Sequence, residues 1–172
     1  MKRTLSLILA AVMVLGLLST VTVSVFAGDT EPTGPVEIKT AEEFAAMAAD
    51  GDYVLAEDIT ISASYASAFT GTFDGANHTI TTSKAIFADL QGTVENLVIA
   101  GTVSHNNHIG ALAVKGNNMY VKNVVNNASV TSTKSESAYL GGLVGSVVTG
   151  AGTAEVREYS YFINCVNNGE IT

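Results

Sequence analysis

The segment VENLVIAGTVS (94–104) recurs along the chain as VKNVVNNASVT (121–131) and as FINCVNNGEIT (162–172). The first pair shares four identities in eleven positions and the second pair shares five, and the copies start 27 and then 41 residues apart. Asparagine stands at the third position of every copy, and apolar residues hold the first, fourth, fifth and tenth positions. This internal repeat decides the fold prediction, because units of this size bury an apolar face only by stacking on their neighbours.

The repeat predicts an all-β fold in which successive copies stack in parallel. Its residues follow strand-like patterns, and no helix pattern appears after residue 51. Such a stack is a β-solenoid, whose successive coils pair at a spacing of about 4.8 Å. Because equivalent residues then lie above one another, Asn96, Asn123 and Asn164 are predicted to form a ladder of side-chain hydrogen bonds. Either of the two apolar positions after the asparagine fits the interior, because a turn at the asparagine resets the alternation.

Shorter signals organise the chain before and between the copies. Thr40 and Glu43 form a capping-box pattern that opens a short amphipathic helix, and Gly51 is its predicted stop. A helix of about ten residues is unstable alone, so it is predicted to cap the β fold. A second repeated block and one long inserted loop lie between the copies. The predicted early strands are 53–56, 59–62, 71–73 and 79–81, the block is 109–113 and 140–145, and the loop is 149–160.

The blocks LGGLVG (140–145) and NCVNNG (164–169) resemble the GLUG-type repeats of secreted bacterial surface proteins. The opening segment FTGTFDG (69–75) is similar to the first coils of their right-handed parallel β-helices, which have the pectate-lyase-like fold. The resemblance covers residues 38–172. It implies a right-handed parallel β-helix with a short N-terminal capping α-helix, in an adhesin-like or host-interacting surface protein.

The chain departs from this pattern in two places. Residues 110–113 lack two of the glycines, and the chain stops at Thr172 in mid-coil. A solenoid needs a polar terminal cap to protect its open edge. We therefore expect these 172 residues to be the N-terminal part of a longer protein.

The first 27 residues have the three parts of a secretory signal peptide. Lys2 and Arg3 precede a long apolar run, which ends in small residues before a predicted cleavage after Ala27. A transmembrane anchor is the alternative, since the run is long enough to span a bilayer. Residues 28–37 hold both prolines and no periodicity, so they are predicted to be a flexible leader to the cap and repeats of 38–172. The prediction is a secreted protein, extracellular or cell wall-associated, with no membrane span after removal of the signal.

The composition excludes several classes of partner and site. The net charge is −8, or −10 without Lys2 and Arg3, and this disfavours nucleic acid and anionic membranes because both repel an acidic chain. Cys165 is the single cysteine, so an internal disulfide is excluded, and its place at an apolar repeat position predicts a buried small hydrophobe. His105 and His108 flank a predicted turn without a third ligand nearby, so neither a metal site nor a cofactor is expected.

Carbohydrate chemistry on a β-helix needs clustered aspartates or an inward-aimed pair of carboxylates. Asp89 is the last aspartate, and the single arginine after the signal, Arg157, lies in the predicted loop. We therefore expect no catalytic residue in this segment. The enzyme alternative is the N-terminal part of a polysaccharide lyase or hydrolase whose catalytic coils lie beyond residue 172.

The favoured hypothesis is a surface β-solenoid that acts as an adhesin, a display scaffold or a binding module for an extracellular glycan or a host or cell-surface protein. Tyr139, Tyr159 and Tyr161 flank the predicted loop and are the candidate ligand-binding residues, because a flat aromatic face packs well on a sugar ring. A solenoid without a terminal cap also presents an unpaired edge, so edge-to-edge self-association is expected. A pure spacer is the third hypothesis.

Overall fold

A computed structural model of the chain describes residues 34–133, 138–148 and 159–172. In this part of the chain the fold is nearly all-β, with one short helix, and every strand pair is parallel. The parallel β class predicted from the repeat is thus confirmed. The predicted signal peptide with its cleavage after Ala27, most of the predicted leader and residues 149–158 of the predicted loop lie outside the described residues.

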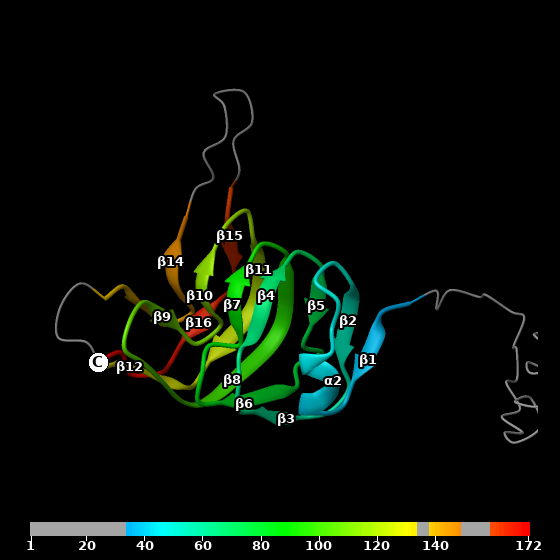
Figure 1. Cartoon of the computed structure of the whole chain (residues 1–172), viewed down its shortest axis with the longest axis horizontal. Helices are drawn as coiled ribbons and strands as arrows, with labels where there is room; N and C mark the ends of the chain where they lie inside the picture. Colours follow the sequence, from blue (N-terminus) through cyan, green and yellow to red (C-terminus); the bar gives the residue numbers. More distant parts are fainter. Residues whose placement is uncertain (1–33, 134–137, 149–158) are drawn as a thin grey trace, which may run out of the picture. The chain divides into compact units, whose positions relative to one another are not determined.

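The described strands form three sheets, and the chain passes repeatedly from the largest sheet to the four-stranded sheet and back (Figure 1). The largest sheet runs β1–β2–β5–β8–β11–β15, with β6 and β12 joined to it through β8, β3 through β6, and β16 through β11. A second sheet has the order β4–β7–β10–β14, and β9 pairs with β13. The circuits β2–β4 and β5–β7 therefore each add two strands to the largest sheet and one strand to the four-stranded sheet, and in the next circuit the long strand β8 takes the place of the two.

The bounds of the strands in the largest sheet are β1 (Val36–Ile38), β2 (Asp52–Leu55), β3 (Ile59–Ile61), β5 (Thr72–Asp74), β6 (Thr79–Thr82), β8 (Thr93–His105), β11 (Tyr120–Asn126), β12 (Ser129–Ser132), β15 (Tyr161–Ile163) and β16 (Val166–Asn167). Those of the smaller sheets are β4 (Tyr65–Phe69), β7 (Phe87–Leu90), β9 (Ile109–Gly110), β10 (Ala113–Gly116), β13 (Leu140–Gly141) and β14 (Val144–Val147). The four early strands predicted from alternation all form, and none of their bounds differs from the prediction by more than one residue.

Equivalent residues of successive circuits are direct neighbours in the sheets. Phe73 pairs with Val94, Val94 with Val121, and Val121 with Phe162. Phe73, Val94 and Val121 are fully buried, so this position of the repeat forms a continuous apolar column. Val103 and Val130 pair in the same way and are also fully buried. Each circuit therefore obtains its core from the circuits on either side of it.

The structure also decides which position after the asparagine faces inward. Leu97 and Val124 are fully buried and pair with each other, whereas Val98 and Val125 are only half-buried. The fourth position of the repeat is therefore the interior one. Cys165 occupies this position in the last copy, where it is half-buried against the core cluster rather than fully buried as predicted.

The repeat asparagines have a left-handed backbone, with φ of 52° at Asn96, 54° at Asn123 and 52° at Asn164. The Asn123 side-chain nitrogen donates to Oδ1 of Asn96 over 2.8 Å, and that of Asn164 donates to Oδ1 of Asn123 over 3.4 Å. Asn96 in turn donates to Oδ1 of Asp74 over 3.0 Å. Asparagine tolerates the left-handed region, and its amide both donates and accepts, so one residue serves the bend and the inter-strand contact.

The predicted capping box is confirmed at the start of helix α2 (Ala41–Ala45). The Glu43 backbone N–H donates to Oγ1 of Thr40 over 3.2 Å, and the Thr40 N–H donates to the Glu43 carboxylate over 3.1 Å. The helix has five residues, half of the predicted length. The Ala48 N–H donates to the Tyr53 hydroxyl over 2.6 Å, so the backbone just after the helix is bonded to a side chain instead of continuing the helix.

Gly51 has a different role from the predicted helix stop. It lies at a corner of the chain where Gly71 and Gly92 occupy the equivalent places of the next two circuits, just before β5 and β8. A Cβ atom on Gly71 would collide with the Gly51 carbonyl oxygen, and one on Gly92 would collide with that of Gly71. The corner therefore needs glycine because the backbones of adjacent circuits approach each other closely there.

Helix α2 covers one end of the apolar interior through a single aromatic side chain. The ring of Phe44 lies 6.3 Å from that of Tyr65 and 5.9 Å from those of Phe73 and Phe87, measured between centroids. Phe44 is only 2% exposed. Strand β1 lies beside β2 at the same end and includes the last two residues of the predicted leader, so the first strand of the described residues begins at Val36.

Replacement of Asn123 by alanine tests the ladder. We expect Asn123→Ala to lower the free energy of unfolding by about 1–3 kcal/mol beyond any backbone effect, because it leaves the amides of Asn96 and Asn164 without their partner. Asn118→Ala is the matched control, since Asn118 has a similar left-handed φ of 49° but is exposed and outside the ladder. Urea unfolding of both variants measures the difference, and equal losses would contradict a stabilising ladder.

Replacement of Phe44 tests the cap. We expect Phe44→Ala to lower the free energy of unfolding by about 3–5 kcal/mol, the usual effect of removing a buried phenylalanine ring. Glu42→Ala on the same short helix changes an exposed side chain and should alter stability by less than about 0.5 kcal/mol. Thermal unfolding followed by near-ultraviolet circular dichroism compares the two. A Phe44→Ala protein as stable as the Glu42→Ala protein would show that the helix does not close the core.

Candidate functional site

A row of outward-facing side chains crosses the largest sheet from β2 to β15. The row consists of Asp52, Thr72, Thr93, Tyr120 and Tyr161, which pair in this order across β2, β5, β8, β11 and β15. The residue that follows each of them along the chain points the other way, into the core, except at the last strand. Period-two alternation therefore places two hydroxyl side chains and two tyrosines in one line on the surface.

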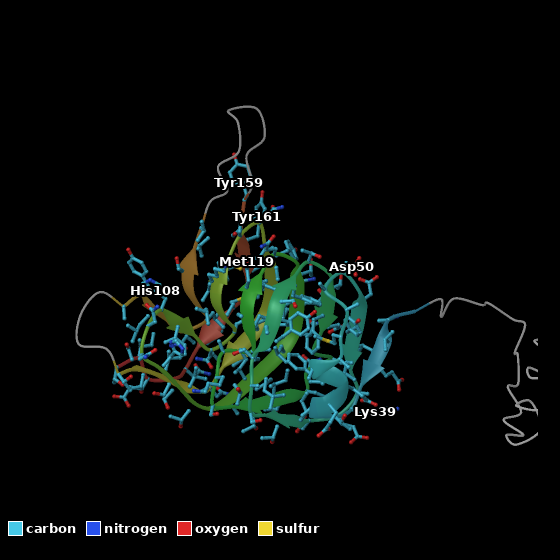
Figure 2. The ribbon with its side chains drawn as sticks, viewed as in Figure 1. Lys39, Asp50, His108, Met119, Tyr159 and Tyr161 are labelled. Atoms are coloured by element: carbon cyan, nitrogen blue, oxygen red, sulfur yellow. The ribbon has the colours of Figure 1, made fainter. Side chains whose placement is uncertain are left out.

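The tyrosine strip, defined here as Tyr120, Tyr159 and Tyr161, lies at the end of this row. The ring centroids of Tyr120 and Tyr161 are 6.2 Å apart, and those of Tyr159 and Tyr161 are also 6.2 Å apart. The three side chains are 37%, 51% and 52% exposed, in sequence order. Figure 2 shows Tyr159 and Tyr161 at the same edge of the fold, close to Met119. The strip is a contiguous exposed aromatic surface on the last two circuits.

Backbone pairing fixes the strip to the sheet. The Tyr161 N–H donates to the Met119 carbonyl oxygen over 2.8 Å, and the Met119 N–H donates to the Ser160 hydroxyl over 3.4 Å. Tyr120 and Tyr161 are then held as a directly opposed cross-strand pair. Such pairs keep their side chains within contact distance, so the rings are arranged before any ligand arrives.

A second outward row lies two residues further along the same strands and carries charge. Asp74 pairs with Glu95, Glu95 with Lys122, and Lys122 with Ile163. Lys122 Nζ lies 3.9 Å from a Glu95 carboxylate oxygen. Opposite charges on adjacent strands offset each other, so the surface beside the tyrosine strip combines aromatic rings, hydroxyl groups and a neutralised ion pair.

The structure separates Tyr139 from the other two predicted tyrosines. Its ring stacks on the His108 imidazole, with centroids 4.4 Å apart and an interplanar angle of 24°. The Tyr139 N–H also donates to Nδ1 of His108 over 2.8 Å. Tyr139 is 63% exposed, but within the described residues its ring contacts none of the three rings of the strip. Of the three predicted residues, the fold brings Tyr159 and Tyr161 together with Tyr120 and gives Tyr139 a histidine partner.

The other two histidines, His78 and His105, lie in separate parts of the fold. His78 Nδ1 lies 3.2 Å from Oδ1 of Asp58, whose other contact is a 2.8 Å hydrogen bond from the Thr79 N–H. The bond from Thr79, followed by that from His78, holds the pKa of Asp58 below its ordinary value. His105 is exposed at the end of β8. Within the described ranges no three side chains of His, Cys, Asp or Glu come together as metal ligands.

Several carboxylates of the described part have a structural partner. Asp89 lies 2.8 Å from the Lys115 ammonium group, and Glu95 faces Lys122. Asp74 accepts from the Ala76 N–H over 2.8 Å in addition to the Asn96 amide. In each case a carboxylate that a hydrolase could use is committed to a turn, a ladder or an ion pair.

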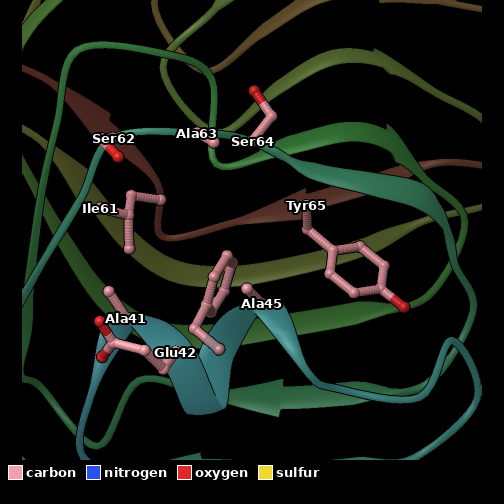
Figure 3. A pocket seen from close by; sticks show the side chains of 9 residues that line it. Ala41, Glu42, Ala45, Ile61, Ser62, Ala63, Ser64 and Tyr65 are labelled. Atoms are coloured by element: carbon pink, nitrogen blue, oxygen red, sulfur yellow. The ribbon is translucent and has the colours of Figure 1, made fainter.

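A hollow lies between helix α2 and the loop that joins β3 to β4. It has a volume of about 240 Å³, and its wall includes the apolar side chains of Phe44, Ile61 and Tyr65. Figure 3 shows Glu42 on the helix side and residues 62–64 on the loop side. Glu42 is the single charged residue in its lining, so this hollow disfavours anionic ligands.

The structure reveals two further residues, Tyr120 and Asn126, that the sequence analysis did not include among the candidates. Tyr120 precedes the second copy of the repeat by one residue, as Tyr161 precedes the third, so an alignment extended by one position would have found the pair. Asn126 is fully buried, and its amide donates to Ala128 O, Gly142 O and the Asn167 side chain over 2.7–2.9 Å. The signal for Asn126 was its identity with Asn167 in the repeat.

No helix in the described ranges is long and apolar enough to cross a membrane. The chain matches no protein-family model, no curated protein sequence and no solved structure.

Proposed function

We propose that residues 38–172 form a right-handed parallel β-helix, that is, a β-solenoid of the GLUG-repeat type with α2 as its N-terminal cap. The support is the strand order, in which the chain returns again and again to the same two sheets and every strand pair is parallel. The register adds to this, since the first copy of the repeat pairs residue for residue with the second. A stack of this kind offers a flat, extended outer face whose side chains recur at the strand spacing.

We infer that the protein binds an extracellular glycan through the tyrosine strip. The observation that carries this inference is the exposure of three neighbouring tyrosine rings, each more than a third accessible, on one rigid sheet edge. A contiguous aromatic surface that is exposed to water marks an interaction site, because covering it with a ligand lowers the free energy. The hydroxyl groups of the same row, on Thr72 and Thr93, supply hydrogen-bond donors and acceptors along the line of the rings.

A sugar chain satisfies both parts of this surface. Its apolar C–H faces pack on the tyrosine rings, and its hydroxyl groups bond to the tyrosine and threonine oxygens. A nucleic acid would also stack on the rings, but the net charge of −8 repels its phosphates. A host or cell-surface protein is the competing ligand, and a binding assay with isolated glycans separates the two.

We propose that the protein acts outside the cell, either secreted or at the cell wall. A signal peptide with cleavage after Ala27 would direct its export. The role is that of an adhesin, a display scaffold or a glycan-binding module, without catalysis in this segment. The alternative remains the N-terminal part of a polysaccharide lyase or hydrolase with its catalytic coils beyond residue 172. Release of soluble sugar by a longer chain that includes those coils, and not by residues 28–172, would identify that alternative.

Retention on insoluble polysaccharides tests the glycan proposal. We expect the protein to be retained on at least one of cellulose, chitin and peptidoglycan, and Tyr161→Ala to weaken this retention about ten-fold, the effect of losing roughly 1.4 kcal/mol of stacking. Tyr161→Phe keeps the ring and should bind nearly as well. Tyr139→Ala removes an exposed tyrosine outside the strip and should bind like the unaltered protein. Retention unaffected by Tyr161→Ala, or absent from all three polymers and from other glycans, would contradict the proposal.

We also propose that the last circuit pairs with a second copy of this chain. Phe162, Val166 and Ile171 are 44%, 47% and 45% exposed, although the residues at the same positions one circuit earlier are buried or half-buried. An exposed apolar edge strand is a template for another strand. A copy of the same edge supplies the same apolar side chains, so the two edges can bury each other in a symmetric contact.

Sedimentation velocity over a range of concentrations tests this pairing. We expect a concentration-dependent dimer that Val166→Lys abolishes, because a charge on the edge strand cannot be buried without a partner. Val36→Lys is the matched control, since Val36 is similarly exposed, at 48%, but lies on β1 at the other end of the largest sheet. A protein that stays monomeric at all concentrations, or a dimer lost only in Val36→Lys, would rule out pairing through the last circuit.

A further inference from the structure

A second depression lies on the other side of residues 62–64, and its charge is opposite to that of the hollow beside α2. It has a volume of about 400 Å³ and is lined by polar side chains from three successive corners of the chain. Ser62 and Ser64 come from the corner between β3 and β4, Lys84 from the corner between β6 and β7, and His105 from the end of β8. The Lys84 pocket, as we call it, is therefore assembled only when three circuits stack.

The floor of the Lys84 pocket is apolar. Ala88 and Val114 lie on β7 and β10, which are adjacent strands of the four-stranded sheet, and Ile109 and Ala85 complete the apolar part of the lining. Both the volume and this combination of an apolar floor with a few polar groups at the rim are typical of small-molecule sites, which usually have about 300–1,000 Å³. The tyrosine strip shares none of these residues.

Lys84 stands out among the described lysines by its lack of an acidic partner. Lys39 lies 2.7 Å from Glu37, Lys115 lies 2.8 Å from Asp89, and Lys122 faces Glu95. No described carboxylate lies within ion-pair distance of Lys84, and the lining of its pocket contains no aspartate or glutamate. The chain has twice as many acidic as basic residues, yet the ionisable residues that line this pocket are one lysine and one histidine. Such a pocket favours an anion.

The backbone at Lys84 is held rigidly by a buried hydroxyl group. Thr82 is 3% exposed, and its Oγ1 accepts from the Lys84 N–H over 3.0 Å and donates to the Lys84 carbonyl oxygen over 2.7 Å. The preceding residue, Ser83, accepts at its carbonyl oxygen from the Ser104 N–H over 3.4 Å, next to His105. The two basic residues of the pocket are thus tied to each other through the backbones of adjacent circuits.

From these observations we propose that the Lys84 pocket binds a small organic carboxylate with an apolar body. The carboxylate lies against the Lys84 ammonium group, within reach of the His105 ring and the hydroxyl groups of Ser62 and Ser64. The apolar body covers the floor formed by Ala88 and Val114. The neighbouring hollow beside α2 has a similar apolar wall but carries Glu42, so it rejects the same ligand by charge.

A titration of the full chain with benzoate and benzamide, followed by NMR, tests the charge requirement. The two probes have nearly the same shape, so only the carboxylate distinguishes them. We expect saturable benzoate binding that shifts the resonances of Ala85, Ala88 and Val114, and an affinity for benzamide at least about ten-fold lower, the usual effect of losing a charge-assisted hydrogen bond. Equal affinities for the two probes, or no saturable shift at these residues, would overturn the proposal.

Three variants assign the effect to Lys84. Lys84→Met keeps the length of the side chain without its charge and should reduce benzoate affinity about ten-fold, to the level of benzamide. Lys84→Arg keeps the charge and should retain the preference, and Lys115→Met removes a lysine that pairs with Asp89 and should leave affinity unchanged. Undiminished benzoate binding by Lys84→Met would refute the assignment. Tyr161→Ala should not alter benzoate affinity, so a failure of the glycan proposal leaves this test intact.

Discussion

The parallel, in-register pairing of successive circuits is the constraint on which the rest of this structure depends. A single circuit is too thin to enclose a core, so each apolar side chain is buried by its counterparts in the circuits above and below. The column Phe73, Val94 and Val121 illustrates this, with all three fully buried. A polar side chain in the interior must also find hydrogen-bond partners there. The buried amide of Asn126 donates to the carbonyl oxygens of Ala128 and Gly142 and to Oδ1 of Asn167.

The two ends of the described stack differ in how well their apolar residues are covered. At the N-terminal end, α2 lies beside β1–β3 (Figure 1). Its Phe44 packs on the rings of Tyr65, Phe73 and Phe87, so the first complete circuit has an apolar cover. At the other end, Phe162 leaves nearly half of its surface accessible, although it continues the column of Val121. The same rule of stacking that buries the middle circuits thus produces an apolar edge wherever a circuit has a neighbour on one side only.

Stacking also assembles surfaces that no single circuit contains. Outward positions recur at the strand spacing, which turns separate tyrosines into a strip and separate threonines into a row of hydroxyl groups. At another corner the same geometry gathers Lys84 and His105 from different circuits over an apolar floor. These two surfaces differ in chemistry: the first suits a neutral, hydroxyl-rich polymer, and the second suits a small anion. Lys115 and Lys122 both form ion pairs, whereas Lys84, in the second surface, has no acidic partner among the described residues.

The amino-acid sequence by itself determined the β class, the parallel pairing of copies 94–104 and 121–131, the capping box at Thr40 and the asparagine positions, because each depends on local periodicity or on direct identity between copies. The tertiary structure alone decided that Leu97 rather than Val98 faces inward, that α2 ends at Ala45, and that Tyr139 stacks on His108. It also paired Phe73 with Val94, although the circuit before residue 93 carries no copy of the repeat. The reason is physical: which residues meet across circuits depends on the length and bends of every connection between them, and these are set by packing of the whole stack.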